Sequence, residues 1–109
     1  MMDRWDLYLS RGATLSQEMT FKENGDVIDL TGYTARSQVR EEPDGGALIC
    51  EMMTAIYGPT GTVIITIGAE TSAELVSGVY CWDLKLTAPG GVTEYYIGGQ
   101  FTVLPTVTE

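Results

Sequence analysis

The chain has 109 residues, with fifteen acidic and six basic side chains, no histidine and a formal net charge of −9. Its length predicts a single domain over residues 1–109 with one modest core. The negative charge repels phosphate backbones and anionic lipid headgroups, so we expect neither nucleic acid nor a membrane among the partners. No segment approaches the about 18 apolar residues of a membrane span, and no apolar signal sequence opens the chain, so we expect synthesis and retention inside a cell.

Alternating apolar and polar residues predict the first strands. In residues 4–9, Trp5 shares an apolar face with Leu7 and Leu9, and we expect all three in the core. Residues 15–22 alternate in the same way. The dipeptide Asn24-Gly25 follows, and it suits the positive φ angles of a tight hairpin turn. The chain should therefore return as a strand through residues 27–30.

The middle of the chain predicts a central strand and two further strands. Residues 33–41 alternate, with Ala35, Ser37 and Val39 on one face. Residues 43–46 read Pro-Asp-Gly-Gly, which predicts a turn. Strands follow at residues 47–54 and 62–67. The second is almost continuously β-branched, as expected where both faces are covered.

One helical turn is predicted between strands. Thr71 and Glu74 have the spacing of a capping box, and Ser77-Gly78 ends the segment. Strands follow at residues 79–87, 92–97 and 99–107. The last two form one long strand if Gly98-Gly99 is a β-bulge. Together these elements predict an all-β fold, an immunoglobulin-like antiparallel β-sandwich of seven or eight strands with one short helical turn. A small closed barrel is the alternative.

The two cysteines are predicted on opposite sides of a sheet. Cys81 alternates with Tyr80 and Trp82, so it lies with Asp83 and Lys85 on the polar face. Cys50 falls with Leu48 and Met52, which form the more plausible inward set. We therefore expect no disulfide between the cysteines.

The sequence indicates no catalytic, cofactor-binding or metal-binding residues. Histidine, the commonest general base, is absent. Glu41, Glu42 and Asp44 are the best candidates for a carboxylate pair or a calcium site, but acidic residues in turns are usually solvated. We therefore expect a protein that is not an enzyme and needs no cofactor.

Some residues are better suited to an interface. Trp82 and Tyr80 are expected in the core, whereas Tyr8 and whichever of Tyr95 and Tyr96 faces outward are surface candidates. The uncharged strand around Ile64, beside Met52-Met53, adds apolar surface. The predicted edge strands contain few lysines and prolines, the residues that commonly prevent edge strands from pairing with another chain. This predicts self-association. The candidate interface comprises Tyr8, Ile64, Cys81, Tyr95 and Tyr96.

Four motifs carry a family resemblance. They are residues 21–25 (FKENG), 29–40 (DLTGYTARSQVR), 78–84 (GVYCWDL) and 99–103 (GQFTV). This pattern resembles small bacteriophage and prophage structural proteins, immunoglobulin-like sandwiches of tails, baseplates or heads, and in particular the amino-terminal domain of upper baseplate proteins. The resemblance implies a virion protein assembled in the bacterial host cytoplasm, a homo-oligomer that also contacts other virion proteins. A carbohydrate- or surface-binding sandwich is the alternative function.

Overall fold

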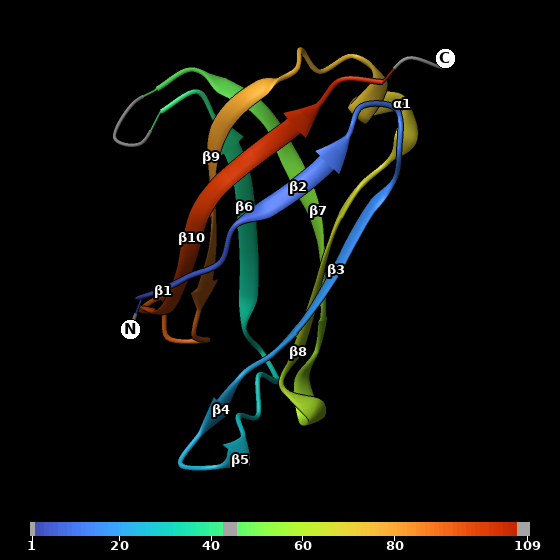
Figure 1. The fold of residues 1–109 in the computed structure, drawn as a ribbon. Helices are drawn as coiled ribbons and strands as arrows, with labels where there is room; N and C mark the ends of the chain where they lie inside the picture. The colour runs from blue at the N-terminus through green and yellow to red at the C-terminus, as the bar shows by residue number, and fades with distance from the viewer. Residues whose placement is uncertain (1, 43–45, 107–109) are drawn as a thin grey trace.

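Two β-sheets face each other in the computed structural model of the protein, which describes residues 2–42 and 46–106 (Figure 1). The larger sheet has the order β1/β2, β10, β9, β6, β7, and the smaller one has the order β7, β8, β3. The strands are β1 Met2–Arg4, β2 Leu7–Ser10, β3 Leu15–Thr20, β4 Lys22–Glu23, β5 Asp26–Val27, β6 Thr34–Arg40, β7 Leu48–Tyr57, β8 Thr62–Ile67, β9 Gly78–Thr87 and β10 Thr93–Leu104. These neighbours are those of the immunoglobulin sandwich. The predicted all-β fold is confirmed.

The two sheets share strand β7. Its first half pairs with β6, from Leu48 to Met52, and its second half pairs with β8, from Met53 to Tyr57. The described parts of β2 and β3, the outermost strands, do not pair with each other. The assembly is therefore an open sandwich and not a closed barrel.

The core lies between the sheets and follows from period-two alternation. Val39 on β6, Trp82 and Leu84 on β9, and Phe101 on β10 project into it. Val63, Ile65 and Ile67 of β8 oppose them; each is at most 2% exposed. The predicted inward faces of β6 and β9 are confirmed. The outward Ile64 and Thr66 of β8 are only half-buried, so the expectation that both faces of this strand are covered is only partly met.

The N-terminal segment departs from its prediction. Both β1 and β2 pair with β10 in parallel, whereas the other strand pairs are antiparallel. The chain leaves the ladder at Trp5 and Asp6, and Trp5 is 38% exposed. The prediction of a core Trp5 in a continuous strand is therefore wrong. The physical reason is the carbonyl of Trp5, which accepts a hydrogen bond from the indole of Trp82 (2.7 Å) instead of continuing the ladder.

The last two predicted strands form one strand, β10. Pairing with β9 runs without interruption through Gly98 and Gly99, and the irregular pairing lies between Thr93 and Tyr95. The predicted bulge at the glycines is therefore wrong. A Cβ on Gly99 would lie 2.5 Å from the carbonyl oxygen of Trp5. Glycine is needed there because the N-terminal segment approaches the backbone closely.

The helical turn begins earlier than predicted. Helix α1 spans Ala69–Ala73, its N-cap is Gly68 without a side-chain cap, and Glu74 is its C-cap. The predicted capping box is therefore wrong. Ser72 is fully buried, and its hydroxyl accepts a hydrogen bond from the amide of Gly12 (2.9 Å). This tertiary contact to the turn after β2 positions the short helix.

The predicted turn chemistry is confirmed at one hairpin. Asn24 and Gly25 have φ angles of 53° and 84° and connect β4 to β5. The return strand is shorter than predicted and covers only Asp26–Val27. The predicted turn at residues 43–46 lies largely outside the described residues. A short 3-10 turn, Gly58–Thr60, connects β7 to β8.

Candidate functional site

A groove of about 820 Å³ lies on the outer face of the larger sheet. It follows strands β6, β9 and β10 and reaches β1 at the sheet edge. Its lining comprises Arg4, Gln38, Arg40, Glu41, Glu42, Val79, Tyr80, Cys81, Trp82, Asp83, Lys85, Tyr96, Gly98, Gly99 and Gln100.

The hollow arises from small residues in the middle of a polar face. Strand register places Cys81 opposite Arg40 on one side and Gln100 on the other. In the next row, Asp83 lies between Gln38 and Gly98. Cys81 is short and Gly98 has no side chain, so the longer side chains around them form walls.

A hydrogen-bond network fixes the β6 wall. The guanidinium of Arg40 donates to Gln38 Oε1 through Nε (3.1 Å) and Nη2 (3.0 Å), and through Nη1 to the carbonyl of Gly46 (2.8 Å). The amide of Gln38 donates to Glu51 Oε1 (3.1 Å), which also accepts from Arg36 Nε (2.9 Å). The hydrogen bond from Gln38, followed by that from Arg36, lowers the pKa of Glu51.

The opposite wall contains an aromatic side chain held by its neighbours. The hydroxyl of Tyr96 donates to Asp83 Oδ2 (3.1 Å). The ammonium of Lys85 lies 5.7 Å from the centroid of the Tyr96 ring, within the range of a cation–π contact. Tyr96 and Asp83 are both half-buried, so this wall is a structured part of the sheet surface.

Charge in the groove differs from that of the chain. Three cations, Arg4, Arg40 and Lys85, line it together with three acids, Glu41, Glu42 and Asp83, so their formal charges cancel. The chain carries −9 in total, and all of this net charge belongs to residues outside the lining.

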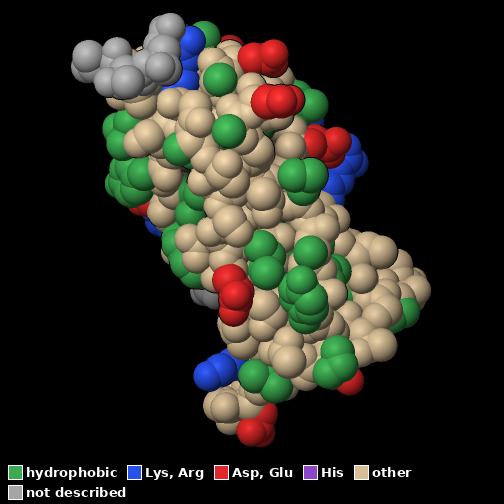
Figure 2. All heavy atoms as spheres, turned by 90° about the vertical axis from the view of Figure 1, so that its right-hand side faces the viewer, with side chains coloured by type: hydrophobic (Ala, Val, Ile, Leu, Met, Phe, Trp, Pro, Cys, Tyr) green, Lys and Arg blue, Asp and Glu red, His purple; other side chains and the backbone are tan. Residues whose placement is uncertain are grey.

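The smaller sheet presents a different outer face, which we call the β3–β8–β7 face. It consists of three cross-strand rows, namely Ser16, Thr66 and Met53; Glu18, Ile64 and Ala55; and Thr20, Thr62 and Tyr57. Glu18 is the single charged residue among these nine. Met53 is 64% exposed and Tyr57 is 54% exposed. Figure 2 looks onto this side of the molecule and shows hydrophobic side chains between widely spaced charges.

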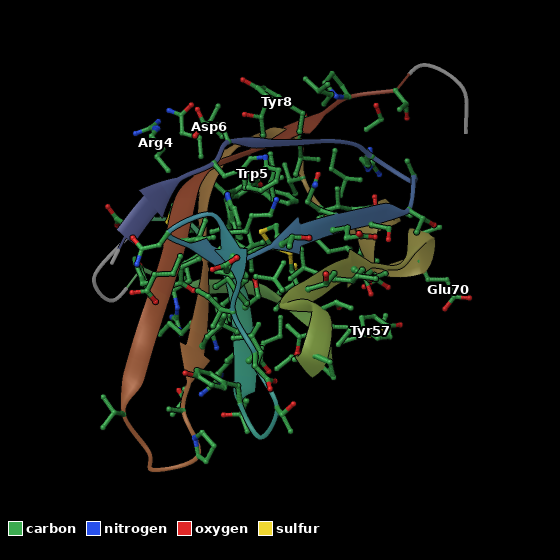
Figure 3. The ribbon with its side chains drawn as sticks, turned by 90° about the horizontal axis from the view of Figure 1, so that it is seen from below. Arg4, Trp5, Asp6, Tyr8, Tyr57 and Glu70 are labelled. Carbon is green, nitrogen blue, oxygen red and sulfur yellow. The ribbon has the colours of Figure 1, made fainter. Side chains whose placement is uncertain are left out.

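The predicted interface residues do not form one site. Cys81 and Tyr96 come together in the groove. Tyr8 is 63% exposed at the edge of the same sheet, where it projects to the same side as Arg4 and Asp6 (Figure 3). Ile64 lies on the β3–β8–β7 face of the other sheet. The side chain of Tyr95 lies outside the described residues.

Sequence reasoning missed the polar wall residues Gln38, Arg40 and Asp83. Their alternation was visible, because Arg36, Gln38 and Arg40 share one face of β6 in the sequence pattern. The cations are spread along the sequence, but strand pairing brings Arg36 opposite Lys85 and Arg40 opposite Cys81. These residues come together because β6 pairs with β9, and the local sequence pattern does not indicate this pairing.

The cysteines lie as predicted, on opposite faces of the larger sheet, and both are free. Cys50 packs against the core, and Cys81 lies in the groove, where its thiol donates to the carbonyl of Arg40 (3.4 Å). Burial raises the pKa of both thiols. Leu48, predicted inward, is 49% exposed. The cause is a bulge, because Val39 pairs with Cys50 while Arg40 pairs with Leu48.

Within residues 2–42 and 46–106, no group of three potential ligands among cysteine, aspartate and glutamate gathers around a common point. Glu41 and Glu42 are exposed, and Asp44 lies outside the described residues. The described part of the chain also contains no helix with the length and apolar character to cross a membrane.

Comparisons with known proteins give structural likenesses, with 119 matching chains among the solved structures. No protein-family model and no curated protein matches the sequence. The fold is similar to part of a family 123 glycoside hydrolase from Clostridium perfringens, described in connection with glycolipid glycan hydrolysis. That likeness has a TM-score of 0.48 and 17% identity, and covers 98% of this chain and 24% of the other. The chain thus spans about a quarter of that protein's length.

Proposed function

We propose that the protein is a non-enzymatic structural protein of a bacteriophage or prophage virion, where it assembles with copies of itself and with other virion proteins. The sequence resemblance to such proteins motivates the virion context. The observation that carries the assembly role is the open edge of β3 beside the β3–β8–β7 face, which has one charge among nine residues.

An open edge favours association because its backbone groups lack partners on one side. In the described structure β3 pairs with β8 alone. Its sequence, Leu-Ser-Gln-Glu-Met-Thr, contains neither lysine nor proline, the residues that commonly protect edges. The β3 edge therefore lacks both lysine and proline as protection against pairing with another strand.

Charge determines where two copies can approach. With a net charge of −9, most orientations of two chains are repulsive. The β3–β8–β7 face has few charges, and it offers Met53, Tyr57 and Ile64 as apolar surface. Tyr57 projects away from the body of the sandwich (Figure 3). Contact through this face buries apolar area with little charge repulsion, which favours a specific oligomer over random aggregation.

Light scattering coupled to size exclusion tests self-association at micromolar concentration and about 0.15 M salt, where electrostatic screening acts over about 8 Å. We expect a mass that is a multiple of 11.8 kDa for the native chain and a lower mass for Met53→Lys. Val79→Lys is the matched control, because Val79 is 62% exposed but lies in the groove of the other sheet. A native monomer contradicts the assembly role.

The virion context needs a separate test. Particles of the phage or induced prophage that carries the gene should contain peptides of this chain after purification by density gradient. The measurement is mass spectrometry of the particles, with an abundant host cytoplasmic protein as the control for contamination. Absence of the chain from intact particles contradicts the virion assignment even if the protein oligomerises.

A further inference from the structure

We propose that the groove on the outer face of the larger sheet binds a neutral oligosaccharide. This function is independent of the β3–β8–β7 face, because the groove lies on the opposite outer surface of the sandwich. Four properties of the groove suit such a ligand, namely its shape, its hydrogen-bonding groups, their fixed positions and its balanced charge.

Shape sets the size of the ligand. The volume of about 820 Å³ lies within the range of about 300–1,000 Å³ that is usual for small-ligand sites. Cys81 is short and half-buried, so it forms a low point between the longer side chains of the walls, whereas Gly98 is buried. The groove follows neighbouring strands of one sheet, which suits an elongated ligand.

The walls offer the donors and acceptors that sugar hydroxyls require. Each hydroxyl both donates and accepts hydrogen bonds. Gln38, Gln100 and Asp83 provide amide and carboxylate groups, and Arg40 provides a planar guanidinium. Planar groups with two polar atoms match two adjacent hydroxyls in the same way that guanidinium matches carboxylate.

These wall groups are already in position. Arg40 makes three hydrogen bonds to Gln38 and Gly46, and Gln38 is bonded in turn to Glu51. Tyr96 is bonded to Asp83. Side chains that are fixed before binding lose little conformational freedom when the ligand arrives. The Tyr96 ring adds an aromatic surface for the apolar C–H groups of a sugar.

Charge selects the ligand class. The formal charges of the lining cancel, whereas the rest of the surface carries −9. An anionic polymer gains no net attraction in the groove and is repelled by the remaining surface. A neutral ligand meets no such repulsion, and it can use both the cationic donors and the anionic acceptors.

The test uses neutral oligosaccharides of glucose, galactose, mannose, xylose and N-acetylglucosamine, with oligogalacturonic acid as the anionic comparison. Amide chemical shifts of the full chain are followed by NMR during titration. We expect at least one neutral oligosaccharide to shift amides of β6, β9 and β10, and to bind more tightly than the anion. Binding by none of the neutral probes, or tighter binding of the anion, overturns the proposal.

Substitutions of groove residues test whether the oligosaccharide binds in the groove. Gln38→Ala and Tyr96→Ala should each weaken binding about tenfold, since each removes hydrogen bonds of the wall. Gln17→Ala and Tyr57→Ala are matched controls on the other sheet, and neither should change affinity. Gln100→Ala, at an exposed position, provides a third groove variant if either of the first two unfolds. Unchanged affinity in every folded groove variant overturns the proposal.

The result of the sugar-binding test can be distinguished from the result of the self-association test. Titrations are repeated with Met53→Lys, which alters the β3–β8–β7 face and leaves the groove intact. Equal affinity in the native protein and in this variant is expected whether or not the native protein oligomerises. If β9 and β10 amides shift with protein concentration alone and no sugar competes, a second copy occupies the groove and the proposal is wrong.

Discussion

The indole nitrogen of Trp82 donates a hydrogen bond to the backbone carbonyl of Trp5 at 2.7 Å, which links the centre of β9 to the N-terminal segment. Trp82 is 3% exposed and part of the core, whereas Trp5 is 38% exposed at the sheet edge. The bond spans 77 positions in sequence. It connects the packing of the core with the attachment of β1 and β2 to β10.

Replacement of Trp82 separates these two roles. Trp82→Ala empties a large core site and should lower the free energy of unfolding by about 3–5 kcal/mol. Trp82→Phe retains much of the apolar volume but leaves the Trp5 carbonyl without its donor, which should cost about 1–3 kcal/mol. Chemical denaturation measures both. Unchanged midpoints would place Trp82 outside the core.

Gly99 tests how closely the N-terminal segment approaches β10. A Cβ there would lie 2.5 Å from the Trp5 carbonyl oxygen and 2.7 Å from Asp6 Oδ1, which accepts from the amide of Gln100 (2.9 Å). Gly99→Ala should therefore destabilise by about 1–3 kcal/mol, as overpacking does. Gly90→Ala is the control, because nothing lies within 4 Å of its Cβ position. Equal denaturation midpoints for the two variants would contradict the close approach.

The carboxyl group of Glu51 should titrate below its ordinary value of 4.5. Hydrogen bonds from Gln38 and Arg36 favour the ionised form and lower the pKa in the folded state. The associated stabilisation is present above the unfolded pKa and is lost as pH falls through the folded pKa. NMR titration of the side-chain carboxyl gives the midpoint directly. Gln38→Ala should raise it, and Thr20→Ala on the other sheet should not.

The two thiols should react slowly in the folded protein. Thiolates are the reactive species, and burial raises the pKa of both Cys50 and Cys81. Mass spectrometry after alkylation without reductant should show two added groups in denaturant and slower addition in native buffer. A denatured species that adds no groups would reveal a disulfide and contradict the opposite faces of the two residues.

Period-two alternation predicted those parts of the fold in which one sheet face is apolar. It gave the inward side of β6 and β9 correctly, because a strand has only two faces. It failed where a long-range contact or an irregular pairing decides the outcome. The position of Trp5 depends on the hydrogen bond that its carbonyl accepts from the Trp82 indole. The orientation of Leu48 depends on a bulge in the pairing of β7 with β6. The position of α1 depends on the buried Ser72.

The groove was beyond sequence reasoning for a related reason. Arg40, Cys81 and Gln100 form one row only because β9 lies between β6 and β10. Strand order is not encoded in local periodicity, so the polar faces of three strands could be identified separately but not combined. Two of the five predicted interface residues, Cys81 and Tyr96, nevertheless belong to the groove.

The parallel pairing of β1 and β2 with β10 has a mechanical consequence. Tension applied before β1 and after β10 pulls these strands past each other along their length, so the hydrogen bonds between them carry load together. The antiparallel β4–β5 hairpin, pulled at its two open ends, would instead lose its bonds one after another. Single-molecule pulling should therefore give one high-force rupture, and gradual opening at low force would contradict this geometry. The hydrogen bonds of β1 and β2 to β10 are thus loaded in shear, and they keep the N-terminal strands attached to the sheet under tension.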